Sequence, residues 1–296
     1  MTASPVFGHV LTAMVTAFDA DGELDVDECA RVARYLVEQG NDGLVVAGTT
    51  GESPVLTDAE KLELWKAVAE AVTVPVVAGT GSNDTRHTVE LTRQAAGVGA
   101  AGVLIVGPYY NRPSQAGIEG HLRAAAAATD LPVMVYDVPS RTARRIDPDV
   151  VQRVVREVPN VVAFKDATGD LPTAARLVAE LGEGFDLYSG DDSLTLPLLA
   201  VGAVGVVGVS THWATPEFVE MVTAFRKGDL DRAREVNALL TETFAFENTD
   251  LSPYSVTAKA MMRTLGFAVG ECRLPNGPTP AGVEDHAREL LARLRG

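Results

Sequence analysis

Residues 161–170 read VVAFKDATGD, and this stretch combines a clear fold signal with one residue that does not fit it. Residues 161–164 form an apolar run that favours a β-strand buried on both faces. Lys165 follows directly. A lysine is rarely buried among apolar residues unless it is paired or has a function. The segment therefore predicts a buried parallel strand with a lysine at its C-terminal end.

Seven further segments resemble this one, and stretches with helical periodicity separate them. Their starts lie 20 to 33 residues apart, which leaves room for a helix and two loops between consecutive strands. We expect the eight strands at residues 10–18, 43–48, 75–81, 102–108, 132–139, 161–168, 185–190 and 205–212. The clearest helical patterns are at residues 25–40, 58–72, 84–99, 147–158 and 215–227. Eight alternating βα units predict an α/β fold, a (β/α)8 TIM barrel.

An open doubly wound sheet is the rival fold for alternating strands and helices. Its usual GxGxxG fingerprint is missing, because the glycines at 202, 205 and 208 follow a GxxGxxG spacing. No further strand is needed after residue 212, and residues 229–296 have the pattern of additional helices. We therefore expect two parts, a barrel catalytic domain at residues 1–228 and a C-terminal helical extension at residues 229–296.

Composition and charge exclude several classes of function. Of 296 residues, 46% are hydrophobic, and 40 acidic against 25 basic residues give a formal net charge of -15. No basic cluster interleaved with aromatics appears, so nucleic acid and anionic membranes are not expected as partners. An anionic substrate would need local donors against this overall charge. The two cysteines and five histidines fall in no metal-binding or redox spacing, and we expect neither a metal nor a bound cofactor.

The sequence also suggests where the protein works. The N-terminus has no basic n-region and no apolar h-region, so secretion is not indicated. The most hydrophobic long stretch, residues 196–210, is interrupted by Pro197 and three glycines and is too short to span a bilayer. A cytoplasmic enzyme is the expectation.

Lys165 is the first candidate for chemistry, because active sites of such barrels lie at the C-terminal ends of the strands. Side chains alternate along a strand, so Lys165 and Ala163 are expected to point into the barrel if Phe164 faces the helices. Burial there lowers the pKa of the amine, and a neutral amine can form a Schiff base with a carbonyl substrate. The alternative is a structural ion pair with Asp166 or Asp191. The strand by itself leaves both possibilities open.

Other polar side chains fall at the same end of the barrel. Tyr136, on the neighbouring strand, could move protons during Schiff-base chemistry, although a barrel-filling aromatic is the alternative. Arg141 follows in the next loop and offers a planar fork for a carboxylate, although a surface ion pair would also explain it. Further hydroxyls are expected nearby from Thr49, Thr50, Tyr109 and Tyr110.

Taken together, the motifs at these strand ends resemble the dihydrodipicolinate synthase family, also called 4-hydroxy-tetrahydrodipicolinate synthases. They are GTTGES (48–53), PYYNRPSQ (108–115), YDVPSRT (136–142), Lys165 followed by Asp166, and SGDD (189–192). The resemblance runs from about residue 7 to residue 274, with the motifs in family order. The chain is similar to the actinobacterial type through GLVVAGTTGESP (43–54) and NDTRHT (83–88).

The resemblance implies a pyruvate-dependent class I aldolase of the lyase type. It would condense pyruvate with L-aspartate 4-semialdehyde to give 4-hydroxy-tetrahydrodipicolinate, in lysine and diaminopimelate biosynthesis. Its only cofactor-like group would be the covalent Schiff base with pyruvate on Lys165. Another pyruvate aldolase acting on a keto-sugar acid, or a non-catalytic protein that binds a keto acid, are the alternatives. VPSRT and GTTGE favour the synthase over sialate lyases.

The resemblance also assigns roles to individual residues. Lys165 would carry the Schiff base, and Tyr136, Thr49 and Tyr110 would relay protons. Tyr110 would reach in from a neighbouring subunit, so the active unit would be at least a homodimer, and the family usually forms tetramers. Substrate-binding roles are implied for Thr50 and the backbone of Val207 at the pyruvate carboxylate, for Arg141 at the aldehyde carboxylate, and for Gly190.

The sequence departs from the family pattern at several positions. Ala17 replaces a usual Pro, Gly107 a Thr and Gly208 a Ser, and the two glycines are expected to widen the pocket or loosen its hydroxyl network. Residues 246–260 also differ from the usual tail. These changes bear on the second substrate more than on the Schiff base.

The family's lysine feedback site is altered as well. Asn83 and Tyr109 are kept, but Asp58, Lys61 and His87 stand where lysine-sensitive members carry His, His and Glu. We therefore expect inhibition by lysine to be weak or absent.

Overall fold

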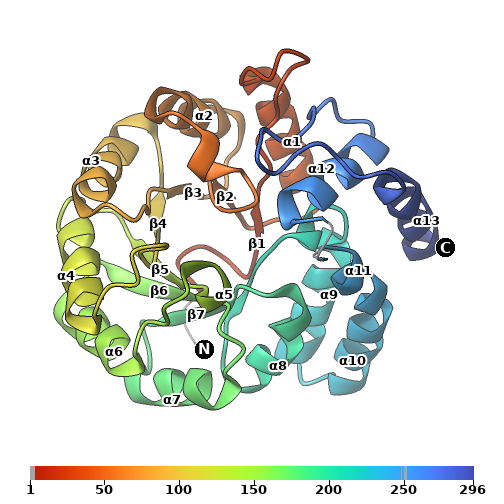
Figure 1. Cartoon of the computed structure of the whole chain (residues 1–296). Coiled ribbons are helices and arrows are strands. Elements are labelled where there is room, and N and C mark those ends of the chain that lie inside the picture. The colour runs from red at the N-terminus through yellow and green to blue at the C-terminus, as the bar shows by residue number, and fades with distance from the viewer. Residues whose placement is uncertain (1–3, 248, 250–251) are drawn as a thin grey trace.

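A closed barrel of parallel strands forms the centre of the molecule (Figure 1). The computed structural model describes residues 4–247, 249 and 252–296. Strand β1 pairs with both β2 and β8, which closes the sheet. The eight strands are β1 (Val10–Ala13), β2 (Gly43–Val46), β3 (Val76–Gly79), β4 (Gly102–Val106), β5 (Val133–Asp137), β6 (Val161–Asp166), β7 (Asp186–Ser189) and β8 (Gly205–Gly208). This confirms the predicted TIM barrel.

Helices connect the strands and surround the barrel (Figure 1). Those up to the last strand and directly after it are α1 (Val26–Glu38), α2 (Asp58–Ala71), α3 (Thr85–Ala95), α4 (Gln115–Ala126), α5 (Pro139–Thr142), α6 (Pro148–Glu157), α7 (Leu171–Leu181), α8 (Thr195–Ala200) and α9 (Thr215–Arg226). Short 3₁₀ turns occur at η1 (Ser53–Val55), η2 (Ala96–Val98), η3 (Asp192–Leu194) and η4 (Ser210–His212). Every helical pattern singled out in the sequence corresponds to a helix.

Further helices follow the barrel and gather along one side of it (Figure 1). They are α10 (Leu230–Leu239), α11 (Thr241–Glu247), α12 (Tyr254–Thr264) and α13 (Val283–Arg295). The helical pattern of residues 230–246 is divided between α10 and α11. The chain breaks at Leu240, where the Thr241 hydroxyl donates to the Ala238 carbonyl oxygen at 2.8 Å. A hydroxyl that bonds the backbone in this way competes with regular helix bonds. The division into two domains at residue 228 stays a prediction.

Local sequence explains where helices begin, as at Thr57 before α2. The Glu60 backbone N–H donates to the Thr57 hydroxyl at 3.2 Å, and the Thr57 N–H donates to the Glu60 carboxylate at 2.7 Å. This is the capping box that the TDAE sequence at 57–60 predicts.

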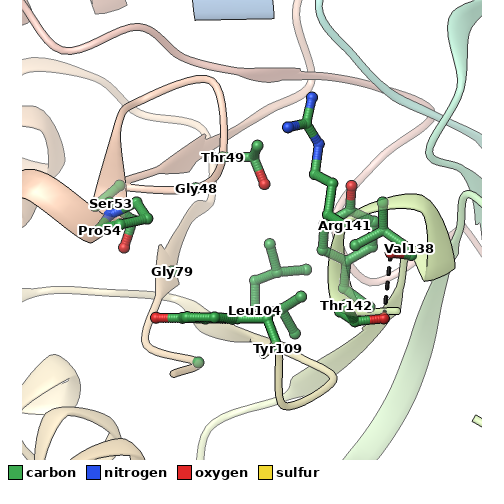
Figure 2. Close-up of a pocket in the computed structure, with 14 residues that line it drawn as sticks. Gly48, Thr49, Ser53, Pro54, Gly79, Leu104, Tyr109, Val138, Arg141 and Thr142 are labelled. Carbon is green, nitrogen blue, oxygen red and sulfur yellow. Dashed lines mark hydrogen bonds between the residues drawn. The ribbon is translucent and has the colours of Figure 1, made fainter. Parts of the chain in front are cut away.

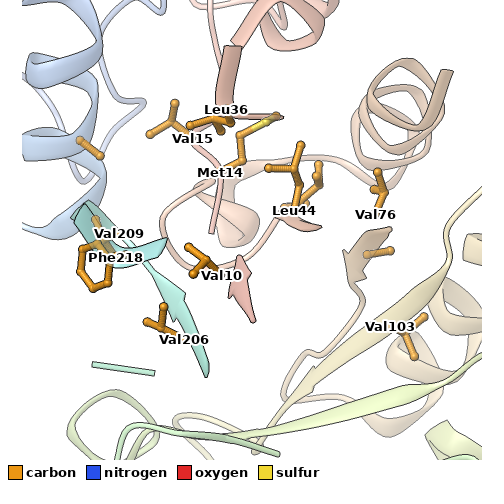
Figure 3. Packing of buried hydrophobic residues seen from close by; sticks show 14 of the residues in the cluster. Val10, Met14, Val15, Leu36, Leu44, Val76, Val103, Val206, Val209 and Phe218 are labelled. Atoms are coloured by element: carbon orange, nitrogen blue, oxygen red, sulfur yellow. The ribbon is translucent and has the colours of Figure 1, made fainter. Parts of the chain in front are cut away.

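Successive side chains on each strand point alternately toward the helices and into the barrel, which gives two separate apolar layers. Val10, Leu44, Val76, Val103 and Val206 face outward and pack with helix residues in one large cluster (Figure 3). The neighbouring residues on the same strands fill the barrel interior, namely Leu11, Val45, Val77, Leu104 and Val207. Side chains fill the barrel interior, so it is not a channel. The chemistry is therefore expected at the C-terminal ends of the strands.

The sixth strand follows the same rule. Phe164 belongs to the outer cluster and Ala163 to the interior one. Lys165 lies two residues after Ala163 and is only 5% exposed. Its side chain is therefore on the barrel side of β6, as the alternation predicts.

Helix α12 joins the C-terminal helices to the barrel. Residues 255–262 are all buried. The Lys259 ammonium lies 2.8 Å from the Glu52 carboxylate, and both side chains are completely buried. Glu52 directly follows the GTTG sequence at the end of β2, so this ion pair ties α12 to a loop at the mouth of the barrel. Within the part of the chain that the structure describes, no helix is long and apolar enough to cross a membrane.

Candidate active site

A pocket of about 240 Å³ opens at the C-terminal ends of β2 to β5 (Figure 2). Loops after four successive strands form its wall. The lining residues are Ala47, Gly48, Thr49, Ser53, Pro54, Gly79, Gly81, Leu104, Val106, Tyr109, Tyr136, Val138, Arg141 and Thr142. Four residues that the sequence placed near the site, Thr49, Tyr109, Tyr136 and Arg141, thus line this pocket. The pocket is large enough for a small keto acid and is polar on only part of its surface.

Lys165 is not among the residues that line this pocket, but it lies beside Tyr136, which is. In the register of the sheet, Lys165 is level with Tyr136 on β5 and Tyr188 on β7. Its Nζ atom is 4.5 Å from the centre of the Tyr136 ring. Burial lowers the pKa of the amine to about 8, the nearby charge of Asp192 opposes this shift, and Arg141 adds to it. About a tenth of the amine is therefore neutral at pH 7, far more than for an exposed lysine, and the neutral form is the nucleophile.

Neither predicted structural ion pair of Lys165 forms. Among the described residues, Asp166 accepts a hydrogen bond from the Thr168 backbone N–H at 2.8 Å. Asp191 binds the backbone N–H and the hydroxyl of Ser193. The contact that Lys165 does make is with the face of an aromatic ring, which leaves its amine available.

Tyr136 carries a titratable hydroxyl on the ring that lies against this amine. It is 5% exposed, and burial raises the pKa of its phenol to about 12, while Arg141 and a hydrogen bond with Thr49 oppose the rise. The phenol therefore keeps its proton at neutral pH. A protonated phenol linked to a hydroxyl can donate a proton to an oxygen and recover it by way of Thr49.

Arg141 supplies positive charge at the opening. It lies in the short helix α5, which begins directly after β5, and its side chain is exposed. Figure 2 shows this side chain extending toward the side of the pocket where Thr49 lies. The predicted surface ion pair is formed instead by Arg145, whose guanidinium lies 2.7 Å from Asp170. Among the described residues Arg141 forms no ion pair, so its guanidinium can receive an anionic ligand.

Three further predicted residues lie off the pocket wall. Thr50 is buried next to Thr49. Val207 is part of the barrel interior, paired with Leu11 of β1. Gly190 lies against Lys165, because a Cβ atom there would come within 3.0 Å of the lysine side chain. A larger residue at 190 would therefore require the Lys165 side chain to shift.

Comparison with known proteins identifies the family. The family model described as the dihydrodipicolinate synthetase family matches residues 6–294. The chain belongs to this family. A relative from Acidothermus cellulolyticus, named 4-hydroxy-tetrahydrodipicolinate synthase, is 48% identical over 98% of this chain and 91% of its own length. A second, from Halalkalibacterium halodurans, is 43% identical over 98% and 99%, and is named 4-hydroxy-tetrahydrodipicolinate synthase 2.

Solved structures of the family superimpose closely on this chain. The enzyme from Cyanidioschyzon merolae with lysine bound gives a TM-score of 0.96 at 39% identity, covering 99% of both chains. A dihydrodipicolinate synthase from Bacillus anthracis gives 0.93 at 40% identity, with the same coverage. The family's barrel is therefore conserved in this chain over its whole length.

One residue expected from the family resemblance, Tyr110, is absent from the pocket wall. It is 88% exposed and has a backbone φ of 70°, a left-handed conformation that is uncommon outside glycine. In the single chain, Tyr110 thus contributes nothing to the site beside Lys165.

A group of acidic residues near Lys165 was not predicted from the sequence. Asp192 accepts hydrogen bonds from the backbone N–H groups of Val209 and Ser210, at 3.0 and 2.6 Å, and from the Ser210 hydroxyl. Glu247, at the end of α11, is 4% exposed, and one of its carboxylate oxygens has no partner. Burial and then the charge of Asp192 raise the pKa of Glu247 well above its usual value. The SGDD motif at 189–192 indicated that Asp192 lies near the ends of the strands. Nothing in the sequence indicated that Glu247 lies near β6.

The departures from the family pattern have local structural explanations. Ala17 donates its N–H to the Cys29 sulfur at 3.1 Å, a bond that a proline could not make. Neither Gly107 nor Gly208 lines the pocket. A Cβ atom at Gly208 would lie 2.7 Å from Thr211 and 2.8 Å from Asp192. Gly208 therefore makes room for Asp192 and does not widen the pocket, contrary to expectation. Asn248, Asp250 and Leu251 of the unusual tail lie outside the described residues.

The positions of the family's lysine site carry an ion pair of their own. The His87 ring lies 2.8 Å from the Asp58 carboxylate. Lys61 is 5% exposed, and burial lowers the pKa of its amine. A cationic ligand would thus meet a second amine here and a carboxylate already engaged by His87. Within the described part of the chain, no group of three metal-ligating side chains occurs.

Proposed function

We propose that this chain is a 4-hydroxy-tetrahydrodipicolinate synthase, which condenses pyruvate with L-aspartate 4-semialdehyde. The product leads to lysine and diaminopimelate. One observation carries the proposal: in a member of this family, a lysine amine with a lowered pKa lies 4.5 Å from the ring of a protonated tyrosine, and this tyrosine lines a pocket together with an arginine that has no ion pair among the described residues.

The first half of the reaction uses Lys165 and Tyr136. The neutral amine of Lys165 adds to the C2 carbonyl carbon of pyruvate, and Tyr136 gives a proton to the resulting oxygen. Loss of water leaves a protonated Schiff base. Removal of a proton from C3 then gives an enamine, with the electron pair of the broken C–H bond delocalised onto the nitrogen. The pyruvate carboxylate is assigned to Thr50 and the backbone of Val207, and Gly190 leaves room for the lysine side chain.

The second half joins the aldehyde to the enamine. C3 of the enamine forms a bond with the aldehyde carbon, and the aldehyde oxygen takes a proton relayed through Tyr136 and Thr49. The substrate's own amino group then attacks the Schiff-base carbon, which closes the ring and releases Lys165 as the free amine. Arg141 is assigned to the carboxylate of the aldehyde, since a planar guanidinium binds carboxylates well. No other cofactor takes part.

The active unit is proposed to be a homodimer or a tetramer built from dimers. A strongly exposed tyrosine on a loop in a left-handed conformation is costly in a monomer, and insertion of Tyr110 into a neighbouring subunit would complete the relay with Tyr136 and Thr49. A structure in the family, 35% identical with a TM-score of 0.93, is described as a monomeric variant. Sedimentation of this protein at assay concentration decides between these states. We further propose a cytoplasmic location.

Turnover with defined aldehydes tests the function. The purified protein is incubated with pyruvate and L-aspartate 4-semialdehyde, and the product is followed by mass spectrometry. We expect turnover, and we expect Arg141→Ala to raise the KM for the aldehyde while the KM for pyruvate stays within about twofold. Turnover with neutral sugar aldehydes alone would contradict the proposal and favour a keto-sugar acid aldolase.

A further inference from the structure

Arg141 rests on an aromatic ring that belongs to the C-terminal helices and not to the barrel. The Cζ atom of Arg141 lies 5.0 Å from the centre of the Tyr254 ring. Tyr254 is the first residue of α12, more than a hundred residues away along the chain. A guanidinium at this distance from an aromatic face is attracted to it. The contact therefore brings α12 to the group assigned to the aldehyde's carboxylate.

The helix that carries Tyr254 is tied to its neighbours in the C-terminal segment and to one loop of the barrel. The Thr257 hydroxyl donates to the Glu247 backbone carbonyl oxygen at 2.6 Å, and the Ser255 hydroxyl accepts from the Asn276 amide at 3.3 Å. One turn further on, Lys259 is paired with Glu52. These contacts hold the first turns of α12 in place, and with them the backbone position from which the Tyr254 ring reaches Arg141.

The surroundings of Tyr254 are strongly acidic apart from Arg141. Burial raises the pKa of its phenol, and so do the charges of Glu247, Asp191 and Asp192, while Arg141 acts in the opposite direction. Arg141 and three carboxyl groups are thus all close enough to the phenol to influence it. Arginine has a long side chain, and a guanidinium that turned toward these carboxyl groups would no longer face an incoming anion.

We infer that Tyr254 is a positioning residue, whose ring holds the Arg141 guanidinium at the pocket that Arg141 lines. This role rests on the proposed function, because it concerns the arginine assigned to the aldehyde's carboxylate. Tyr254 itself does not touch the reacting atoms. Specificity for an acidic aldehyde then depends on a helix outside the barrel.

Replacement of the ring tests this role. A cation–π contact is worth about 0.5 to 2 kcal/mol, which corresponds to a change in affinity of about 2-fold to 30-fold. We expect Tyr254→Leu to raise the KM for L-aspartate 4-semialdehyde within that range, with kcat and the KM for pyruvate within about twofold of the original protein. Tyr254→Phe keeps the aromatic face and should keep the KM for the aldehyde within about twofold.

A double-mutant cycle shows whether Tyr254 acts through Arg141. In an Arg141→Ala background, Tyr254→Leu should cause no further rise in the KM for the aldehyde. An equal rise in both backgrounds, or a rise with Tyr254→Phe as large as with Tyr254→Leu, would overturn the inference. If Tyr254→Leu shows no cooperative melting transition, Tyr254→Met replaces it in the cycle.

Trapping with borohydride separates this inference from the proposed function. A pyruvate adduct on the original protein, together with a KM for the aldehyde that does not respond to Tyr254→Leu, would refute only the role of Tyr254. Absence of the adduct would refute the Schiff-base function and the role of Tyr254 with it.

Discussion

The buried ion pair between Lys259 and Glu52 allows a quantitative prediction for Lys259→Met. Both side chains are completely buried, and their charged atoms are 2.8 Å apart. The ammonium also donates to the Glu271 carbonyl oxygen at 2.9 Å and lies 4.0 Å from the centre of the Phe18 ring. Methionine has a similar length and no charge, so the substitution removes the ammonium while it fills most of the space.

The expected loss in the free energy of unfolding follows from the buried Glu52 charge, which remains without the Lys259 ammonium. After the substitution, the Glu52 carboxylate would keep the hydrogen bond from the Arg273 backbone N–H, at 2.9 Å, and the contact with the Cys272 thiol, but no positive partner in the ion pair. Removal of one partner of a buried ion pair usually destabilises a protein by about 3–5 kcal/mol, because the other charge is left uncompensated. Since Glu52 ends the loop that carries Thr49 and Thr50, we also expect kcat to fall.

Unfolding in urea, with original and variant at the same protein concentration, measures this cost. The matched control is the double variant Glu52→Gln/Lys259→Met, which removes both charges and should recover more than half of the lost free energy of unfolding. A single variant within about 1 kcal/mol of the original protein, or a double variant less stable than the single one, would show that the pair does not stabilise α12 against the barrel.

Three further predictions concern pH and regulation. The amine of Lys165 has a pKa of about 8 and must be neutral to attack pyruvate. We therefore expect kcat/KM for pyruvate to rise with pH up to about pH 8 and, well below that pH, to fall about tenfold for each pH unit. A kcat/KM that stays constant from about pH 6 to 9 would argue against Lys165 as the nucleophile. Inhibition by lysine should be weak or absent because Lys61 and the Asp58–His87 pair occupy its site, whereas half-maximal inhibition below about 1 mM, typical of metabolite binding, would contradict that expectation. Burial raises the pKa of Asp137 to about 7, so the folded state holds an extra proton between about pH 4 and 7 and loses stability as pH rises through that range. Asp137→Asn should flatten this loss when urea unfolding is compared at pH 5 and pH 8, and an unchanged difference would refute it.

Much of the barrel was predictable because its signals are local. A buried parallel strand produces an apolar run such as residues 161–164, and the regular recurrence of such runs specifies a barrel. The same logic placed Lys165, since side chains alternate on a strand whatever the rest of the chain does. Tyr136 and Arg141 followed because the C-terminal ends of neighbouring parallel strands meet at one face.

The contribution of the C-terminal helices was not predictable from such patterns. Glu247 and Tyr254 come close to Lys165 and Arg141 only through the packing of α11 and α12, and no periodicity encodes where a helix packs. Gly208 illustrates the same limit. From the sequence, a glycine in place of the usual serine suggested a wider pocket. In the structure, Asp192 and Thr211 occupy the space next to this glycine.

The most direct test of the central claim is the covalent trapping of pyruvate on Lys165. The protein is incubated with pyruvate, reduced with borohydride, weighed intact and mapped by peptide mass spectrometry. The account predicts one reduced pyruvate adduct per chain, located on the peptide that contains Lys165 and absent from Lys165→Ala. No adduct on the original protein, or an undiminished adduct on Lys165→Ala, would contradict it.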